Sequence, residues 1–322
     1  MLHIDNKTKG ISSENREQAK AERRTKKRSG GFAVKAETLL HIALGIVIAV
    51  IVAILRPQAI DSLLQSEWLG EATLPRYTDG SERESRTPES ADLVSLFPEI
   101  VIRQWNPEKK KIALTFDDGP DDIYTPQILD ILSEYGVRAT FFLIGSLAES
   151  HRDIVERIHR EGHEIGNHTY FHSNLSRMAP WQVLLDLRKA REVFSDITGD
   201  DVLVMRPPYG ALDPPAVKAI GDEGYSILLW TVDSLDWWGL SKEEVVENIL
   251  PKVEKGVIVL QHSSGGPDED LSGSVAALPH IIETLQSEGY SFHTASEILE
   301  EVRLQNERKK EAEEAEKMEG SE

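Results

Sequence analysis

From about Val101 onward, short apolar runs alternate with segments whose apolar residues recur every three or four positions. The runs predict strands at Ile112–Phe116, Ala139–Ile144, Glu164–Asn167, Leu203–Met205, Ile227–Val232, Val257–Gln261 and Tyr290–His293. The other segments predict helices at Thr125–Tyr135, Asp153–Glu161, Trp181–Thr198, Pro214–Glu223, Lys242–Glu254 and Val275–Glu288, several of them ending at a glycine. Six or seven strand–helix units over about 200 residues predict an α/β fold, an irregular (β/α) barrel of about seven parallel strands.

A different pattern precedes this domain. The 17 residues from Leu39 to Leu55 include one His and no Asp, Glu, Lys or Arg. At about 1.5 Å per residue such a helix just crosses a hydrocarbon core of roughly 25–30 Å. We therefore predict one transmembrane helix at residues 36–56. A cleaved signal peptide is the alternative, but the basic segment before the apolar run is long and no small-residue cleavage signal precedes Arg56.

These patterns divide the chain into five parts. Residues 1–35 are polar and basic and predict a disordered segment, which the positive-inside rule places in the cytoplasm, with everything after the helix outside. Residues 57–98, rich in Pro, Ser and charge, predict an extracellular spacer. The α/β domain occupies 99–299. Residues 300–322 are charged and of low complexity, and predict either a solvated helix end or a disordered tail.

Composition narrows the chemistry. The chain has no cysteine, so a metal would have to be held by His, Asp or Glu. Residues 1–35 carry ten Lys and Arg against four Asp and Glu, a net charge of +6. The net charge of the whole chain is −19, and subtracting this +6 leaves −25 on the remaining residues. Nucleic-acid binding needs a basic face, so a nucleic-acid partner is not expected.

Polar residues follow the predicted strands, and in a parallel barrel the catalytic residues lie at the carboxyl ends of the strands. The first strand leads into Asp117 and Asp118, adjacent carboxylates that call for a positive neighbour such as a metal ion. The third leads into His168 and His172, which on a helical turn would face one ion. Taken singly, a turn with ordinary acids and two surface histidines explain these residues as well. The histidine pair His163 and His168 is spaced five apart, one more than in the metalloprotease signature.

The later strand ends carry further candidates: Arg206, Tyr209, Asp236, Trp237, Trp238, Leu260 and His262. An arginine can pair with a carboxylate. Tryptophans beside acids suit a sugar-binding wall, although a Trp packed in the core would look the same in the sequence.

Together and in this order, these blocks resemble the polysaccharide deacetylases with a NodB-homology domain, carbohydrate esterase family four, and are similar to bacterial peptidoglycan N-acetylglucosamine deacetylases. The resemblance covers about Ile112 to Ala295 and all five family motifs. It implies a hydrolase that removes acetyl groups from N-acetylglucosamine units of an extracellular polysaccharide, with peptidoglycan first and chitin oligomers or poly-N-acetylglucosamine next. It also implies a divalent metal cofactor, zinc first, with cobalt or nickel as alternatives.

The resemblance implies roles for the residues of the first three motifs. Asp117 would be the general base, with Arg206 paired to it. Asp118, His168 and His172 would be the metal ligands.

The remaining motifs are implied to supply the acid and the substrate contacts. His262 would be the general acid, oriented by Asp236. Tyr209 falls where the family uses a backbone N–H to hold the oxyanion. Trp237 would wall the sugar site, and Leu260 would line the pocket for the acetyl methyl.

One departure concerns the residues after the last motif. Many relatives follow the final His with Asp or Glu, whereas Ser263-Ser264-Gly265-Gly266 follows here, which puts substrate contacts in question. A variant branch that acts on a muramic-type sugar replaces the second aspartate and the motif Tyr. This chain keeps both, which favours N-acetylglucosamine. A non-catalytic glycan-binding module and a hydrolase of a non-sugar amide are the competing functions, and the sequence indicates no oligomeric state.

Overall fold

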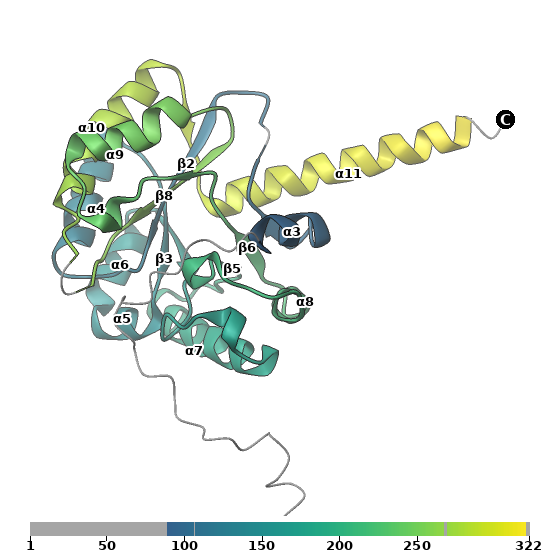
Figure 1. The fold of residues 1–322 in the computed structure, drawn as a ribbon, viewed down its shortest axis with the longest axis horizontal. Helices are drawn as coiled ribbons and strands as arrows, with labels where there is room; N and C mark the ends of the chain where they lie inside the picture. The colour runs from purple at the N-terminus through teal and green to yellow at the C-terminus, as the bar shows by residue number, and fades with distance from the viewer. Residues whose placement is uncertain (1–88, 106, 267–268, 320–322) are drawn as a thin grey trace, which may run out of the picture. The chain divides into compact units, whose positions relative to one another are not determined.

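The computed structural model describes residues 89–105, 107–266 and 269–319 (Figure 1). The predicted cytoplasmic segment, the transmembrane helix at 36–56 and most of the spacer lie outside the described residues. Among the helices of the described part, none is both long and apolar enough to cross a membrane.

One sheet forms the centre of the described domain. Its order is β1-β6-β5-β4-β3-β2-β8-β7, with β9 beside β2, and every pairing is parallel. The strands are β1 Val101–Ile102, β2 Lys111–Asp117, β3 Thr140–Leu143, β4 Glu164–Asn167, β5 Val204–Met205, β6 Ser226–Leu228, β7 Val232–Asp233, β8 Val257–His262 and β9 Ser291–Phe292. The α/β class and the parallel sheet are confirmed. The sheet is nine-stranded and curls into a half-barrel rather than a barrel of about seven strands.

The predicted strand Ile227–Val232 is wrong, because the chain changes partners in its middle. β6 pairs with β1 and β5, whereas β7 pairs with β8 at the other end of the sheet. Between them, the N–H of Leu229 donates to Ile102 O and that of Thr231 donates to Ile258 O. The main chain thus bridges the two ends of the sheet, a change of partner that an apolar run does not reveal.

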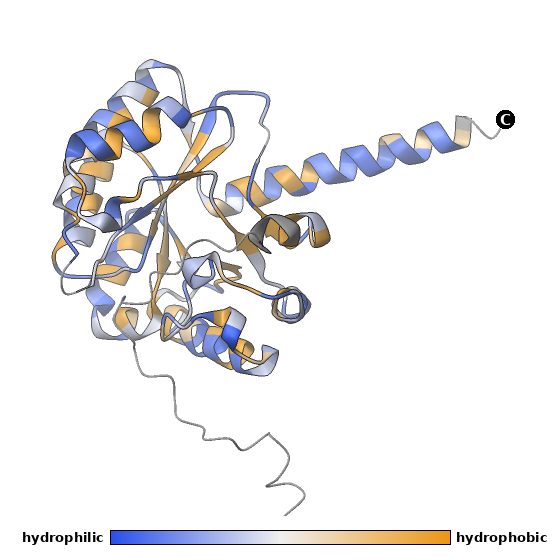
Figure 2. Ribbon diagram, viewed as in Figure 1, coloured by the Kyte–Doolittle hydropathy of each residue, from blue (hydrophilic) through white to orange (hydrophobic). Residues whose placement is uncertain are grey.

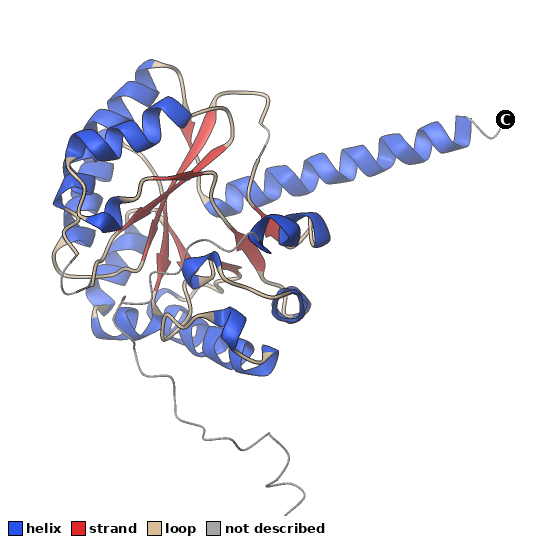
Figure 3. Cartoon of the chain, viewed as in Figure 1, coloured by secondary structure: helices blue, strands red, loops and turns tan. Residues whose placement is uncertain are grey.

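Helices surround the sheet (Figure 3). They are α3 Glu89–Leu96, α4 Tyr124–Tyr135, α5 Gly145–Ser150, α6 Arg152–Arg160, α7 Pro180–Thr198, α8 Pro214–Asp222, α9 Lys242–Ile249, α10 Ser272–Ser287 and α11 Ala295–Glu319. The predicted helix Lys242–Glu254 is too long, since Pro251 has no N–H to donate and α9 gives way to a 3₁₀ turn at Leu250–Lys252. α3 lies inside the stretch predicted as spacer, and its Leu93 is buried.

The apolar strand residues form the core, and the polar helix faces point outward (Figure 2). In β2 every residue from Ile112 to Phe116 is fully buried, and the Phe116 ring stacks on Phe141 with centroids 5.1 Å apart. Burial on both faces explains why this strand reads as a continuous apolar run. It also fixes the strand whose end carries Asp117.

The charged C-terminal stretch, as far as Glu319, is part of α11 (Figure 1). Its first two turns pack on the domain, where Ile298 is buried and Glu301 accepts hydrogen bonds from Trp105 Nε1 at 3.0 Å and Lys111 Nζ at 2.8 Å. The later turns extend away from the sheet. Of the two alternatives for residues 300–322, the described part is a solvated helix end that continues a helix begun inside the domain.

His163 supplies a stability prediction. It is buried against Phe141, and its Nδ1 accepts a hydrogen bond from Ala139 N–H at 3.2 Å. Burial lowers the pKa of His163 to about 4. Between pH 6.5 and 4 the unfolded chain therefore binds a proton that the folded chain does not, so stability falls as the pH falls.

Because the unfolded chain binds this proton, we expect the free energy of unfolding of the parent protein to fall by about 2 kcal/mol between pH 7 and pH 5. His163→Asn, whose amide oxygen can still accept from Ala139, should show a smaller loss in urea denaturation at the two pH values. Equal losses in parent and variant would show that His163 is not the responsible group.

Candidate active site

The predicted site residues meet at the carboxyl ends of four strands. Asp117 ends β2, and His262 ends β8 as its direct register partner. His168 follows β4, and Arg206 follows β5. The alternation of strand and helix brings these distant motifs to one edge of the sheet, as the sequence predicts.

Three of these residues converge as a metal site would require. Asp118 Oδ1 lies 3.2 Å from His168 Nε2 and 3.0 Å from His172 Nε2, and one ligand atom of each residue lies within 4.8 Å of the others. Ligands about 2.0–2.1 Å from a tetrahedral zinc ion are spaced by about 3.3 Å, so the cluster fits such an ion. Asp118 Oδ1 is buried and makes no hydrogen bond, which a bound cation would remedy. Burial opposes the charge on Asp118, yet the two imidazoles hold its pKa well below the usual range.

The backbone at this cluster adopts conformations that side chains normally avoid. Asp118, Thr169 and His172 all have left-handed φ angles, of 69°, 68° and 56°. Hydrogen bonds hold the histidine loop in place: His172 N–H donates to Thr169 Oγ1 at 2.9 Å, and Thr169 N–H donates to Asn167 Oδ1 at 2.9 Å. Strained backbone that is held from several sides is typical of functional sites.

The tautomer of His168 follows from its partner. His168 Nδ1 lies 2.8 Å from the carbonyl oxygen of Arg206, which can only accept, so Nδ1 carries the proton. Nε2, which faces Asp118, is therefore free to coordinate an ion.

Asp186, on α7, has a role that the sequence did not indicate. It is buried, and its Oδ1 accepts a hydrogen bond from the N–H of Tyr170, midway between the two histidines. Burial raises the pKa of Asp186, and the backbone N–H groups of Tyr170 and Phe171 oppose that rise. Within the sequence, Asp186 is only one polar position in a long amphipathic helix, so no local signal marks it.

The candidate base is paired with a buried cation. Arg206 has no solvent exposure, and its Nη1 donates to Asp117 Oδ1 at 2.7 Å and to Thr115 Oγ1 at 2.8 Å. Its Nε donates to Leu228 O at 2.9 Å, and the guanidinium lies 4.2 Å from the centre of the Phe142 ring. Burial lowers the pKa of Arg206, but Asp117 opposes this. Each charge stabilises the other in a place where either alone would be strongly destabilising.

The candidate acid has the opposite pairing, a cation beside a buried carboxylate. His262 Nδ1 lies 2.7 Å from Asp236 Oδ1, and its backbone N–H donates to Asp236 Oδ2 at 3.0 Å. Burial alone would lower the pKa of His262, but Asp236 raises it to about 9. His262 is therefore an imidazolium at neutral pH, with its Nε2 4.0 Å from Asp118 Oδ2.

The residues predicted to contact substrate differ in how far their side chains are exposed. Tyr209 is half exposed, with its hydroxyl 3.3 Å from His172 Nδ1 and its backbone at φ 62°. Trp238 is more exposed than its neighbour Trp237, and the two rings meet edge to face at 5.2 Å. Leu260 is buried in β8 beside Thr115. Their contacts with substrate stay predictions.

The serine that follows the last motif is a structural element. Ser263 is buried, and its N–H donates to Asp117 O at 2.9 Å while its own carbonyl accepts from Thr125 Oγ1 at 2.7 Å. A Cβ added at Gly119 would lie 2.4 Å from Ser263 Oγ. The side chain adds a hydrogen bond from Ser263 Oγ to Asp117 O at 3.3 Å, so the small serine at this departure from the family pattern fits where space is tight.

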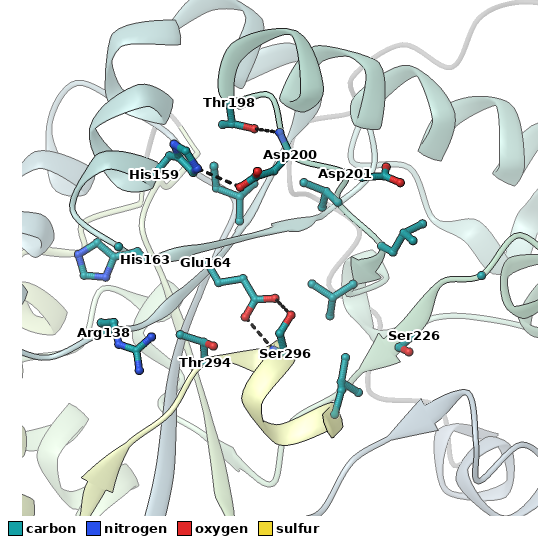
Figure 4. A pocket seen from close by; sticks show the side chains of 17 residues that line it. Arg138, His159, His163, Glu164, Thr198, Asp200, Asp201, Ser226, Thr294 and Ser296 are labelled. Atoms are coloured by element: carbon teal, nitrogen blue, oxygen red, sulfur yellow. Dashed lines mark hydrogen bonds and ion pairs between the residues drawn. The ribbon is translucent and has the colours of Figure 1, made fainter. Parts of the chain in front are cut away.

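A hollow of about 580 Å³ lies at the amino ends of β3 to β6 (Figure 4). None of the predicted site residues lines it. Its polar groups bond to one another: His159 Nε2 lies 2.9 Å from Asp200 Oδ2, and Glu164 accepts from Ser296 N at 2.8 Å. It lies at the opposite end of the strands from the candidate active site.

The described domain is similar to known proteins of one family. Residues 104–228 match the family model for polysaccharide deacetylase. A peptidoglycan-N-acetylglucosamine deacetylase of Bacillus cereus is 42% identical over 186 residues, which are 58% of this chain and 67% of that protein. The chain belongs to the polysaccharide deacetylase family.

Two solved structures of this family share the fold. The peptidoglycan N-acetylglucosamine deacetylase Bc1960 is 38% identical with a TM-score of 0.61, over 63% of this chain and 95% of that chain. A Bacillus anthracis pseudoenzyme of carbohydrate esterase family four is 29% identical with a TM-score of 0.58, over 62% of this chain and 69% of that chain. Since an active deacetylase and a pseudoenzyme share this fold, the side chains of the site must decide the activity of a polysaccharide deacetylase.

The position of Asp186 yields a prediction about metal binding. Asp186→Ala removes the acceptor that holds the loop between the two histidines, and should weaken zinc affinity by about tenfold or more. Asp186→Asn keeps an acceptor oxygen and should retain most of the affinity. Titration against a competing chelator measures both.

Asp196→Ala is the matched control, because Asp196 lies on the same helix and pairs with Arg152 at the surface. An unchanged affinity in Asp186→Ala, with the fold intact by circular dichroism, would mean that the loop keeps its geometry without this carboxylate.

Proposed function

We propose that this polysaccharide deacetylase hydrolyses the N-acetyl group of N-acetylglucosamine units in cell-wall peptidoglycan and releases acetate. One observation carries the proposal: a carboxylate and an imidazolium end two adjacent strands beside a three-residue metal site. Each has a buried counter-ion of its own, Arg206 for Asp117 and Asp236 for His262.

Asp118, His168 and His172 would hold the metal. Two imidazoles and a carboxylate are a common catalytic zinc set, which cobalt or nickel also accept, and zinc is our proposal. When bound, the ion would polarise the acetyl carbonyl and make a water molecule nucleophilic near neutral pH.

Asp117 is the proposed acceptor of the water proton. Arg206 holds one of its carboxylate oxygens, Oδ1, and the second, Oδ2, lies 3.8 Å from His168 Nε2, at the metal site. The backbone N–H of Tyr209 is the proposed donor to the oxyanion, a contribution of about 3–4 kcal/mol for such a donor.

His262 is the proposed proton donor to the leaving nitrogen. An amine anion leaves poorly, so the C–N bond breaks only as the nitrogen takes a proton. The carboxylate of Asp236 keeps His262 charged until that moment. Amide hydrolysis needs both a proton acceptor and a proton donor, which Asp117 and His262 would supply.

The choice of substrate rests on the relatives and on the site rim. The Bacillus cereus relative and Bc1960 both act on peptidoglycan N-acetylglucosamine. The exposed rings of Tyr209 and Trp238 suit the apolar face of a sugar. We further propose that residues 36–56 anchor the chain in the cell membrane with the deacetylase domain outside, which would bring it near this substrate.

Acetate release from purified peptidoglycan and from chitooligosaccharides tests the proposal. The zinc-loaded parent should release acetate, and more of it from peptidoglycan than from chitooligosaccharides. Chelation of the metal should abolish this release until zinc is restored. Asp117→Asn and His262→Ala should each lower the rate on the order of 10²–10⁴-fold.

Asp122→Asn is the control, since Asp122 is an exposed acid a few residues beyond the site. Full turnover by either site variant would show that the substituted residue does not have the role proposed for it. A parent that binds zinc and releases no acetate from either polymer would instead indicate another amide substrate or a binding function.

A further inference from the structure

A chain of buried hydrogen bonds continues behind Asp236. Ser274, in the first turn of α10, donates its hydroxyl to Asp236 Oδ2 at 2.7 Å. Gln261, the residue before His262 in β8, donates its Nε2 to Ser274 Oγ at 3.0 Å. All three side chains have at most 2% of their surface exposed. Neither Ser274 nor Gln261 is among the residues that the motifs identify.

The direction of these hydrogen bonds is fixed by chemistry. An ionised Asp236 can only accept, so the Ser274 hydroxyl donates to it. The Gln261 amide N–H then occupies a lone pair of Ser274 Oγ and keeps the hydroxyl turned toward Asp236. Gln261 Oε1 is buried with no hydrogen-bond partner. Such a group destabilises a fold, so its presence calls for an explanation other than packing.

Ser274 completes the set of donors that holds Asp236. Oδ1 bonds to the His262 ring, while Oδ2 accepts from the His262 backbone and from Ser274. Without the serine, Oδ2 keeps a single donor, and the plane of the carboxylate is less well defined. Because His262 follows that plane, the aim of its Nε2 depends on the serine.

The start of α10 is itself held rigidly. A Cβ added at Gly273 would lie only 1.9 Å from Leu240 O, so the backbone before Ser274 packs directly against the chain that leads into α9. Only glycine permits this approach. The position of the serine hydroxyl is therefore set by main-chain packing and not by a flexible loop.

We propose that Ser274, oriented by Gln261, is a positioning residue that acts through Asp236 to aim His262 at the leaving nitrogen. This inference rests on the proposed general-acid role of His262. It predicts that Ser274 matters only when the leaving group needs a proton.

The test compares two substrates that differ in that need. A chitooligosaccharide loses an amine, which must be protonated, whereas 4-nitrophenyl acetate loses a phenolate, which leaves without a proton. In the zinc-loaded full-length protein, Ser274→Ala should lower kcat on the amide by about tenfold and leave the ester rate within about twofold. KM and zinc affinity should not change.

Matched variants complete the experiment. Ser272→Ala removes an exposed serine two residues earlier on the same helix and should change neither rate. Ser274→Thr keeps the hydroxyl and should restore amide turnover. Gln261→Met keeps the volume but not the amide, and should show the amide-selective loss more weakly. His262→Ala supplies the reference for a complete loss of the proton donor.

The outcomes separate the two proposals. Equal losses on amide and ester in Ser274→Ala, or no loss on the amide, would overturn the role of the serine while His262→Ala remained amide-selective. If His262→Ala itself affected both substrates alike, the general-acid assignment would fail, and the role of Ser274 with it. A zinc-loaded parent without amide turnover would overturn the proposed function.

Discussion

A single fully buried arginine connects the parts of this site. The guanidinium of Arg206 holds Asp117 at the end of β2, and the backbone carbonyl of the same residue holds His168 after β4. One residue thus places both the candidate base and one metal ligand. A buried charge is stable only with full hydrogen bonding and a counter-ion, so the surrounding strands are constrained to supply them.

The two residues proposed to transfer protons have neighbours of opposite charge. A fixed cation accompanies the carboxylate of Asp117, and a fixed anion accompanies the imidazole of His262. Asp117 and His262 end neighbouring strands in direct register. The distance between acid and base is therefore set by the register of the sheet, and the orientation of each side chain is set by its buried partner.

The sequence predicted the parts of this site that lie in short blocks at strand ends. Asp117, Asp118, His168, His172 and His262 follow apolar runs, and parallel strands bring such ends together. The strand order, the open half-barrel and the two-residue strands β1 and β7 were not predictable, because they depend on pairing partners and not on local pattern.

The supporting residues were missed for a similar reason. Asp186 and Ser274 act on segments 16 and 38 positions away in the chain. A lone acid or serine on an amphipathic helix looks like a solvated position, and the predicted start of the last helix at Val275 left Ser274 in a loop. Their function exists only in the packed structure.

The change of strand partner between β6 and β7 has a consequence for the charge beneath the site. Where β6 leaves the sheet, the carbonyl groups of Leu228 and Leu229 turn to the Arg206 guanidinium, at 2.9 Å from Nε and 3.4 Å from Nη2. A closed barrel would use such carbonyls in its own ladder. At this change of partner, main-chain carbonyl groups thus take the place that water would have around the interior cation.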